Sequence, residues 1–176
     1  DIPNTVGNGL CSLLRLRPDI LNVHTAGGLR MMRAASEALH NAAEAEGVVC
    51  PKLIGVTVLT SMDAEDWAGL GHTEPVADSV LRRAKLAQEA GLDGVVASPA
   101  ETAEIRRACG EDFLIVTPGI RPAGVSHDDT GGSARTARED RGDHGWTFFA
   151  DFGAAQPALC GKVQCASASC LYTAAL

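Results

Sequence analysis

The sequence predicts an α/β fold whose core is a sheet of parallel strands. Short and almost continuously apolar segments alternate with alanine-rich stretches in which apolar residues recur every three or four positions. Strands that are apolar on both faces are typical of parallel sheets covered by helices. Polar residues gather where the apolar segments end, which is the ligand-binding edge of such sheets. These observations leave two architectures open: a (β/α) barrel and a doubly wound open sheet.

Strands and helices are predicted to alternate along the first two-thirds of the chain. The strands are expected near residues 20–24, 53–59, 93–97 and 113–117. The helices are expected within residues 4–16, 29–47, 63–71, 75–91 and 99–110. Asn4 or Thr5 is expected near the cap of the first helix, and Asp63 is expected to cap the third. Gly47 and Gly91 are expected to stop two helices, because glycine adopts the left-handed conformation readily.

Composition and charge make some classes of binding partner unfavourable for this protein. The formal net charge of the 176 residues is −7, and such a field repels nucleic acids and anionic membrane surfaces. No apolar run approaches the roughly 20 residues that span a bilayer, and no secretory signal is visible. Cys11, Cys50 and Cys109 are scattered singly, as in proteins of a reducing cytoplasm. We therefore expect a globular cytoplasmic protein in which local groups hold any phosphate ligand.

Five motifs carry a more specific signal: "DIPNTV", "NVHTAGG", "GVTVLTSM", "AGLDGVVAS" and "VTPGIRP". In this order, from Asp1 to about Asp129, they resemble the bacterial type of orotidine 5′-phosphate decarboxylase. The resemblance implies a homodimeric (β/α)8 TIM barrel of the ribulose-phosphate-binding type that needs no cofactor and no metal. It also implies conversion of orotidine 5′-phosphate to UMP and carbon dioxide, the last step of de novo pyrimidine synthesis. The four predicted strands correspond to about half of such a barrel.

The resemblance assigns a catalytic role to Asp1. The family alternates two lysines with two carboxylates so that each charge is compensated in a dry site. Asp1 matches the final aspartate, which the family contributes across the dimer interface, and Thr5 matches a threonine that reaches the partner's ligand. We expect both lysines and the first aspartate to lie upstream of Asp1, since the chain begins within the motif. Read from the residues alone, Asp1 could instead be a cap at the entry to a helix.

Six residues, Thr5 among them, match positions of the family that bind the substrate: Ile2, Thr5, Thr60, Ser61, Pro118 and Arg121. Thr60 matches a threonine that binds the base, and Ser61 lies beside it. Arg121 matches an arginine on a loop near the phosphate or ribose, where a guanidinium fork is well suited. Pro118 is expected to shape that loop by fixing φ. The alternatives are hydroxyls that satisfy a strand end and an arginine in a surface ion pair.

The composition changes abruptly after about His127. We therefore divide the chain into a partial barrel domain, residues 1–129, and an atypical tail, residues 130–176. Thr130 stands where the family has a phosphate-binding glutamine, and no Gly-Arg pair follows in the tail. Our hypothesis is a shift of reading frame near Asp129, and the alternative is a genuine but divergent tail. The tail cysteines lack the paired spacing of a zinc site.

Two other functions stay open at this point. One is a related sugar-phosphate enzyme, such as a hexulose-phosphate synthase or a keto-gulonate-phosphate decarboxylase, although "DIPNTV" together with "VTPGIRP" favours the orotidine enzyme. The other is a non-catalytic remnant that dimerises with a longer subunit. Because half a barrel leaves open sheet edges, we expect the chain alone to be inactive and to fold poorly or aggregate.

Overall fold

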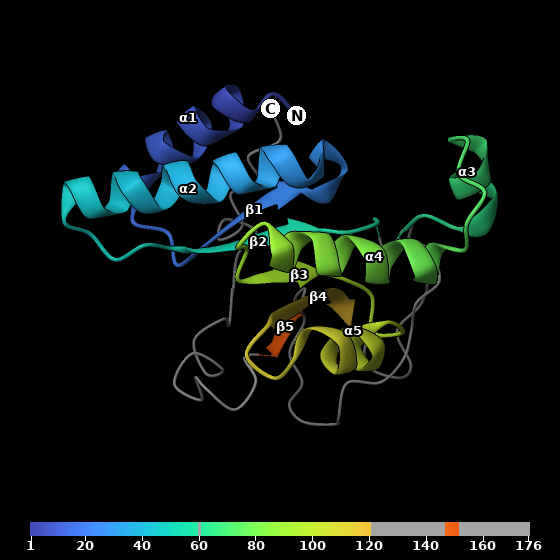
Figure 1. Ribbon diagram of the computed structural model, residues 1–176. Helices are drawn as coiled ribbons and strands as arrows, with labels where there is room; N and C mark the ends of the chain where they lie inside the picture. The colour runs from blue at the N-terminus through green and yellow to red at the C-terminus, as the bar shows by residue number, and fades with distance from the viewer. Residues whose placement is uncertain (60, 121–146, 152–176) are drawn as a thin grey trace.

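The computed structural model describes residues 1–59, 61–120 and 147–151 and shows one sheet with helices packed along one face (Figure 1). The strands are β1 (Ile20–His24), β2 (Lys52–Val56), β3 (Gly94–Val96), β4 (Leu114–Ile120) and β5 (Thr147–Asp151). The helices are α1 (Pro3–Leu13), α2 (Gly28–Glu46), α3 (Ala64–Gly69), α4 (Val76–Glu89) and α5 (Thr102–Cys109). Two short 3₁₀ turns, η1 (Leu14–Leu16) and η2 (Thr25–Gly27), follow α1 and β1.

The sheet has the order β1-β2-β3-β4-β5, and its first four strands are parallel. The four strands and five helices predicted from the sequence are all present, with bounds shifted by a few residues. β5 was not predicted: it lies in the aromatic part of the tail and pairs antiparallel with β4. Its direction shows that the parallel β/α pattern does not continue into this segment.

Local signals at the helix ends behave mostly as expected. Gly47 has a φ of 64° and ends α2, and the carboxylate of Asp63 accepts hydrogen bonds from two backbone N–H groups at the start of α3. The predicted cap of α1 was wrong. The N-cap position is Ile2, which makes no side-chain cap bond, and Pro3 opens the helix. Proline suits the first helical position because its fixed φ is helical and its missing N–H would have been unpaired there.

The two faces of the sheet have different partners. Side chains that alternate along the strands pack against the helices in the main core; they include Leu21, Val23, Leu53, Val95 and Ile115. The opposite face carries a small cluster of Ile54, Leu114 and Val116, with Ile20 and Val96 packed against it. Asn22 lies in register with Ile54 on this second face and is only 6% exposed. Its Oδ1 has no hydrogen-bond partner among the residues that the structure describes.

α1 packs closely along α2, and the two run in the same direction (Figure 1). Gly7 permits this approach, because a Cβ there would lie 3.1 Å from the Cβ of Ala38. The thiol of Cys11 also donates to the carbonyl oxygen of Ala38 over 3.5 Å. Since α2 runs opposite to the strands, the first residues of the chain lie toward the carboxyl end of the sheet.

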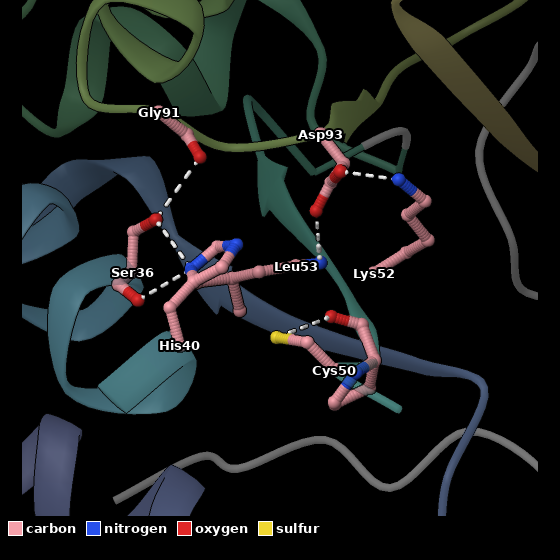
Figure 2. Close-up of polar contacts among 8 residues, drawn as sticks. Ser36, His40, Cys50, Lys52, Leu53, Gly91 and Asp93 are labelled. Atoms are coloured by element: carbon pink, nitrogen blue, oxygen red, sulfur yellow. Dashed lines mark hydrogen bonds and ion pairs between the residues drawn. The ribbon is translucent and has the colours of Figure 1, made fainter. Parts of the chain in front are cut away.

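A polar cluster ties the amino ends of β2 and β3 together (Figure 2). Asp93 Oδ1 accepts from Lys52 Nζ at 2.7 Å, and Asp93 Oδ2 accepts from the backbone N–H of Leu53 at 2.9 Å. Nearby, Ser36 of α2 donates to the carbonyl oxygen of Gly91 over 3.0 Å. In barrel-like folds this edge of the sheet serves stability, whereas the opposite edge carries the chemistry.

Candidate active site

Threonine hydroxyls join the carboxyl ends of β1, β2 and β3. Thr25 Oγ1 donates to the carbonyl oxygen of Val56 over 2.8 Å, and Thr57 Oγ1 donates to the carbonyl oxygen of Val96 over 2.7 Å. Both threonines are buried, at 4% and 2% exposed, so these bonds satisfy groups that would otherwise be costly to bury. The strand ends are therefore held in a fixed arrangement beneath the loops that follow them.

Arg83 of α4 reaches into the same region. Its Nη1 donates to the carbonyl oxygen of Thr57 over 3.1 Å, and its Nε donates to Ser79 Oγ over 3.2 Å. The guanidinium carbon lies 5.5 Å from the centroid of the Trp67 ring, within cation–π range. Burial lowers the pKa of Arg83, and the charge of Arg82 lowers it further. The group nevertheless stays cationic, because guanidinium is not deprotonated in proteins.

Trp67 fixes α3 above this edge of the sheet. The ring is 5% exposed, and its Nε1–H donates to the carbonyl oxygen of Glu74 over 2.8 Å. His72 stacks on it with the ring centroids 3.6 Å apart and the planes 9° from parallel. Sequence reasoning singled out neither Trp67 nor Arg83. The two residues lie in different helices, so no local pattern indicates that they are in contact. The available signal was a tryptophan on the apolar face of one predicted helix and an arginine in the next.

The residues predicted to form the site fall into three places. Asp1 and Ile2 precede α1 and Thr5 lies in its first turn; all three side chains are exposed. Ser61 is exposed in a turn after β2, where the N–H of Met62 donates to the carbonyl oxygen of Leu59 over 3.0 Å. These positions are compatible with one site at the carboxyl edge. Within the described part of the chain, no hydrogen bond joins Asp1, Thr5 and Ser61, so their roles stay predictions.

The remaining three predicted residues are Thr60, Pro118 and Arg121. Thr60 and Arg121 lie outside the described residues. Pro118 is half-buried within β4, where the pairing with β5 shifts register between Thr117 and Ile120. A proline has no N–H for the ladder, so an irregular pairing is the expected consequence.

The chemistry that these side chains offer is binding through hydroxyls and main-chain groups, next to an apolar sheet face. Across residues 1–59, 61–120 and 147–151, no group of three or more His, Cys, Asp or Glu side chains is placed to hold a metal ion. None of the helices in the described ranges is long and apolar enough to cross a membrane. A carboxylate at this edge can come only from Asp1 among the predicted site residues.

Comparison with known proteins decides the family. The family model described as orotidine 5′-phosphate decarboxylase / HUMPS matches residues 1–148. The chain belongs to the orotidine 5′-phosphate decarboxylase / HUMPS family. Within it, the chain is 52% identical over 130 residues to the orotidine 5′-phosphate decarboxylase of Moorella thermoacetica, a match that covers 73% of this chain and 52% of the relative. The enzyme of Rhodospirillum rubrum is 50% identical over 129 residues, with the same coverage of both chains.

Two solved structures agree with the fold described above. The crystal structure of orotidine 5′-phosphate decarboxylase from Lactobacillus acidophilus has a TM-score of 0.65 and 43% identity, and the match covers 70% of this chain and 55% of that one. An uncharacterised conserved protein from Geobacillus kaustophilus has a TM-score of 0.62 and 47% identity. The chain thus spans about half the length of the relatives that it matches, and its parallel sheet with covering helices corresponds to about half of a TIM-barrel decarboxylase.

Proposed function

We propose that this chain supplies part of the active site of a cytoplasmic orotidine 5′-phosphate decarboxylase. The observation that carries the proposal is the 52% identity over 130 residues to the Moorella thermoacetica enzyme, and the family model matches residues 1–148, which hold every predicted site residue. The placement of Ser61 after β2 and of Pro118 near the carboxyl end of β4 supports it, because ligands of such folds bind where strands end. The substrate is orotidine 5′-phosphate, and the products are UMP and carbon dioxide.

The reaction breaks the bond between C6 and the carboxyl carbon and leaves the electron pair on C6, which is then protonated. Resonance stabilises this carbanion only a little, so the enzyme must lower the free energy of the transition state by electrostatic stabilisation. Asp1 is proposed to be the carboxylate that faces the leaving carboxyl group within an alternating array of charges. The sheet face opposite the helices is apolar at Ile54 and Val116, and a dry surface strengthens such charge interactions.

The other site residues are proposed to bind the parts of the nucleotide that do not react. Thr60 and Ser61 bind the pyrimidine, and Arg121 binds the phosphate or the ribose. Pro118 shapes the loop before Arg121. Binding energy from these remote groups lowers the barrier when it is realised in the transition state. No cofactor or metal is required in this scheme.

A homodimer is proposed, with Asp1, Ile2 and Thr5 reaching the site of the partner subunit. Ile2 is 61% exposed, and an apolar side chain this open to solvent at the start of α1 is consistent with burial against another subunit. Asp1 and Thr5 are exposed beside it. The 176-residue chain by itself is proposed to be inactive, because the lysines of the charge array are not among its matched motifs.

The boundary between residues 129 and 130 is also a proposal. A shifted reading frame would explain the change of composition and the missing Gln and Gly-Arg of the phosphate site. The nucleotide sequence tests it. An alternative frame that encodes a Gln, a Thr-Pro and a Gly-Arg-Pro series supports the shift, and its absence favours a divergent tail.

A chimera tests the proposed activity. Residues 1–129 of this chain, the predicted partial barrel domain, replace the matched segment of the Moorella thermoacetica enzyme, which supplies the rest of the barrel. The purified chimera is assayed with orotidine 5′-phosphate, a hexulose phosphate and a keto-gulonate phosphate. We expect turnover of the orotidine substrate alone. A folded chimera that acts on either sugar phosphate instead would support the related barrel enzymes, and a folded chimera without any turnover would support the non-catalytic remnant.

A further inference from the structure

We propose that Arg83 is a positioning residue that fixes both ends of the segment carrying Ser61. The proposal rests on the proposed nucleotide site, of which Ser61 is a member. The segment leaves the sheet at Thr57 and enters α3, which contains Trp67. One side chain from α4, that of Arg83, contacts Thr57 and Trp67 together.

The first contact fixes the point where the chain leaves β2. The carbonyl oxygen of Thr57 accepts from Arg83 Nη1 at 3.1 Å and from Thr25 Oγ1 at 3.3 Å. The N–H and the hydroxyl of Thr57 both donate to the carbonyl oxygen of Val96, at 3.2 and 2.7 Å. Thr57 is therefore held by η2, β3 and α4 at once, and among these bonds Arg83 supplies the one with a charged donor.

The second contact fixes the far end of the segment. The Arg83 guanidinium lies over the indole of Trp67, which is itself held by the hydrogen bond to Glu74 and the stack on His72. Ser79 Oγ accepts from Arg83 Nε and so restrains the rotation of the guanidinium plane. A flat cation with several donors suits this double task, whereas a lysine ammonium is a single point of charge.

Between these two ends, the described residues 58, 59, 61 and 62 differ in how far they are buried. Val58 is 7% exposed and Met62 packs against the main core, whereas Leu59 is 50% exposed and Ser61 is exposed. Its internal support is the hydrogen bond from the N–H of Met62 to the carbonyl oxygen of Leu59. The exposed part of such a turn opens more easily than its buried neighbours, and fixing both flanking ends limits that opening. The position of Ser61 at the carboxyl edge therefore depends on the two contacts of Arg83.

Hydrogen–deuterium exchange of the full 176-residue chain tests the role. The variants are Arg83→Leu, which removes both contacts, and Arg83→Lys, which keeps a cation. Arg107→Leu is the matched control, since Arg107 makes a 3.8 Å ion pair with Glu104 on the exposed face of α5. Loss of a charge-assisted hydrogen bond predicts exchange at residues 58–63 about tenfold faster in Arg83→Leu. The exchange rate of Arg83→Lys at these residues should lie between the rates of Arg83→Leu and the unmodified chain. The exchange rate of Arg107→Leu should equal that of the unmodified chain.

Three results would overturn the positioning role: unchanged exchange at residues 58–63, equal acceleration in β1 and α2, or no difference between the leucine and lysine variants. If Arg83→Leu does not fold, the exchange rate of Arg83→Lys at residues 58–63 is compared with that of Arg107→Leu. Faster exchange in Arg83→Lys supports the positioning role, and equal exchange overturns it. Binding of UMP is measured on the same proteins by calorimetry and should weaken in the same order. If the unmodified chain does not bind UMP while the exchange follows the expected order, the proposed nucleotide site fails and the positioning role stands.

Discussion

Replacement of Asp93 by alanine should destabilise the fold by about 3 kcal/mol, mainly through one hydrogen bond. Asp93 Oδ2 accepts from the N–H of Leu53, a residue with no exposed surface, and a hydrogen bond to a charged group contributes about 1.5–3 kcal/mol. Asp93 directly precedes β3, and its carboxylate accepts the hydrogen bond from β2 in place of a backbone carbonyl group. The ion pair with Lys52 adds at most about 1 kcal/mol, because the side chains are 45% and 25% exposed.

Urea unfolding in dilute solution, followed by circular dichroism, measures the effect. Asp93→Asn keeps an oxygen that can accept from Leu53 and should cost about 1 kcal/mol, and Lys52→Met should cost about the same or less. The expected order of stability is therefore unmodified chain, then Lys52→Met and Asp93→Asn, then Asp93→Ala. A Lys52→Met variant as unstable as Asp93→Ala would refute the reasoning, because the ion pair rather than the bond to Leu53 would then be the main contribution.

Three further predictions concern stability. Asp63→Ala should lower the free energy of unfolding by about 1 kcal/mol by removing the N-cap of α3, and Asp63→Asn should restore most of it, as judged by urea unfolding. Asn22→Leu should raise the melting temperature, because it removes a buried Oδ1 that lacks a partner among the described residues, a group whose burial costs about 1–3 kcal/mol. A lower melting temperature would mean that Oδ1 has a partner elsewhere. Burial raises the pKa of the Cys109 thiol above its ordinary 9.0, so the free energy of unfolding should fall as the pH rises above 9.0, and Cys109→Ala should reduce that fall.

The strands and helix ends could be predicted because their signals are local. Gly47 and Asp63 act within one turn of their own helix, and each was identified from a few neighbouring residues. The cap of α1 was misplaced for a local reason too: Pro3 can open a helix without a capping side chain. Periodicity likewise gave β1 to β4, since each strand is apolar along most of its length.

The contacts between distant residues could not be predicted. Arg83 contacts the carbonyl oxygen of Thr57 across 26 positions, and no pattern in either segment indicates that pairing. β5 pairs with β4 from far along the chain, and its five residues give too short a pattern to be distinguished from a loop. For the site, motif order indicated which residues to consider, but in the proposed homodimer Asp1 reaches the ligand of another subunit, and the sequence of one chain does not show that contact.

The most direct test of the central claim is the rate of carbon dioxide release from orotidine 5′-phosphate by the chimera and by its Asp1→Asn variant. Asparagine has nearly the shape of aspartate and lacks the charge, so binding of UMP should persist while turnover falls by at least about a hundredfold, the range found when a group that stabilises a transition state is removed. A matched Asp19→Asn variant, changed at an exposed aspartate before β1, should keep full activity. Equal rates for Asp1→Asn and the unmodified chimera would contradict the claim that this carboxylate takes part in the decarboxylation.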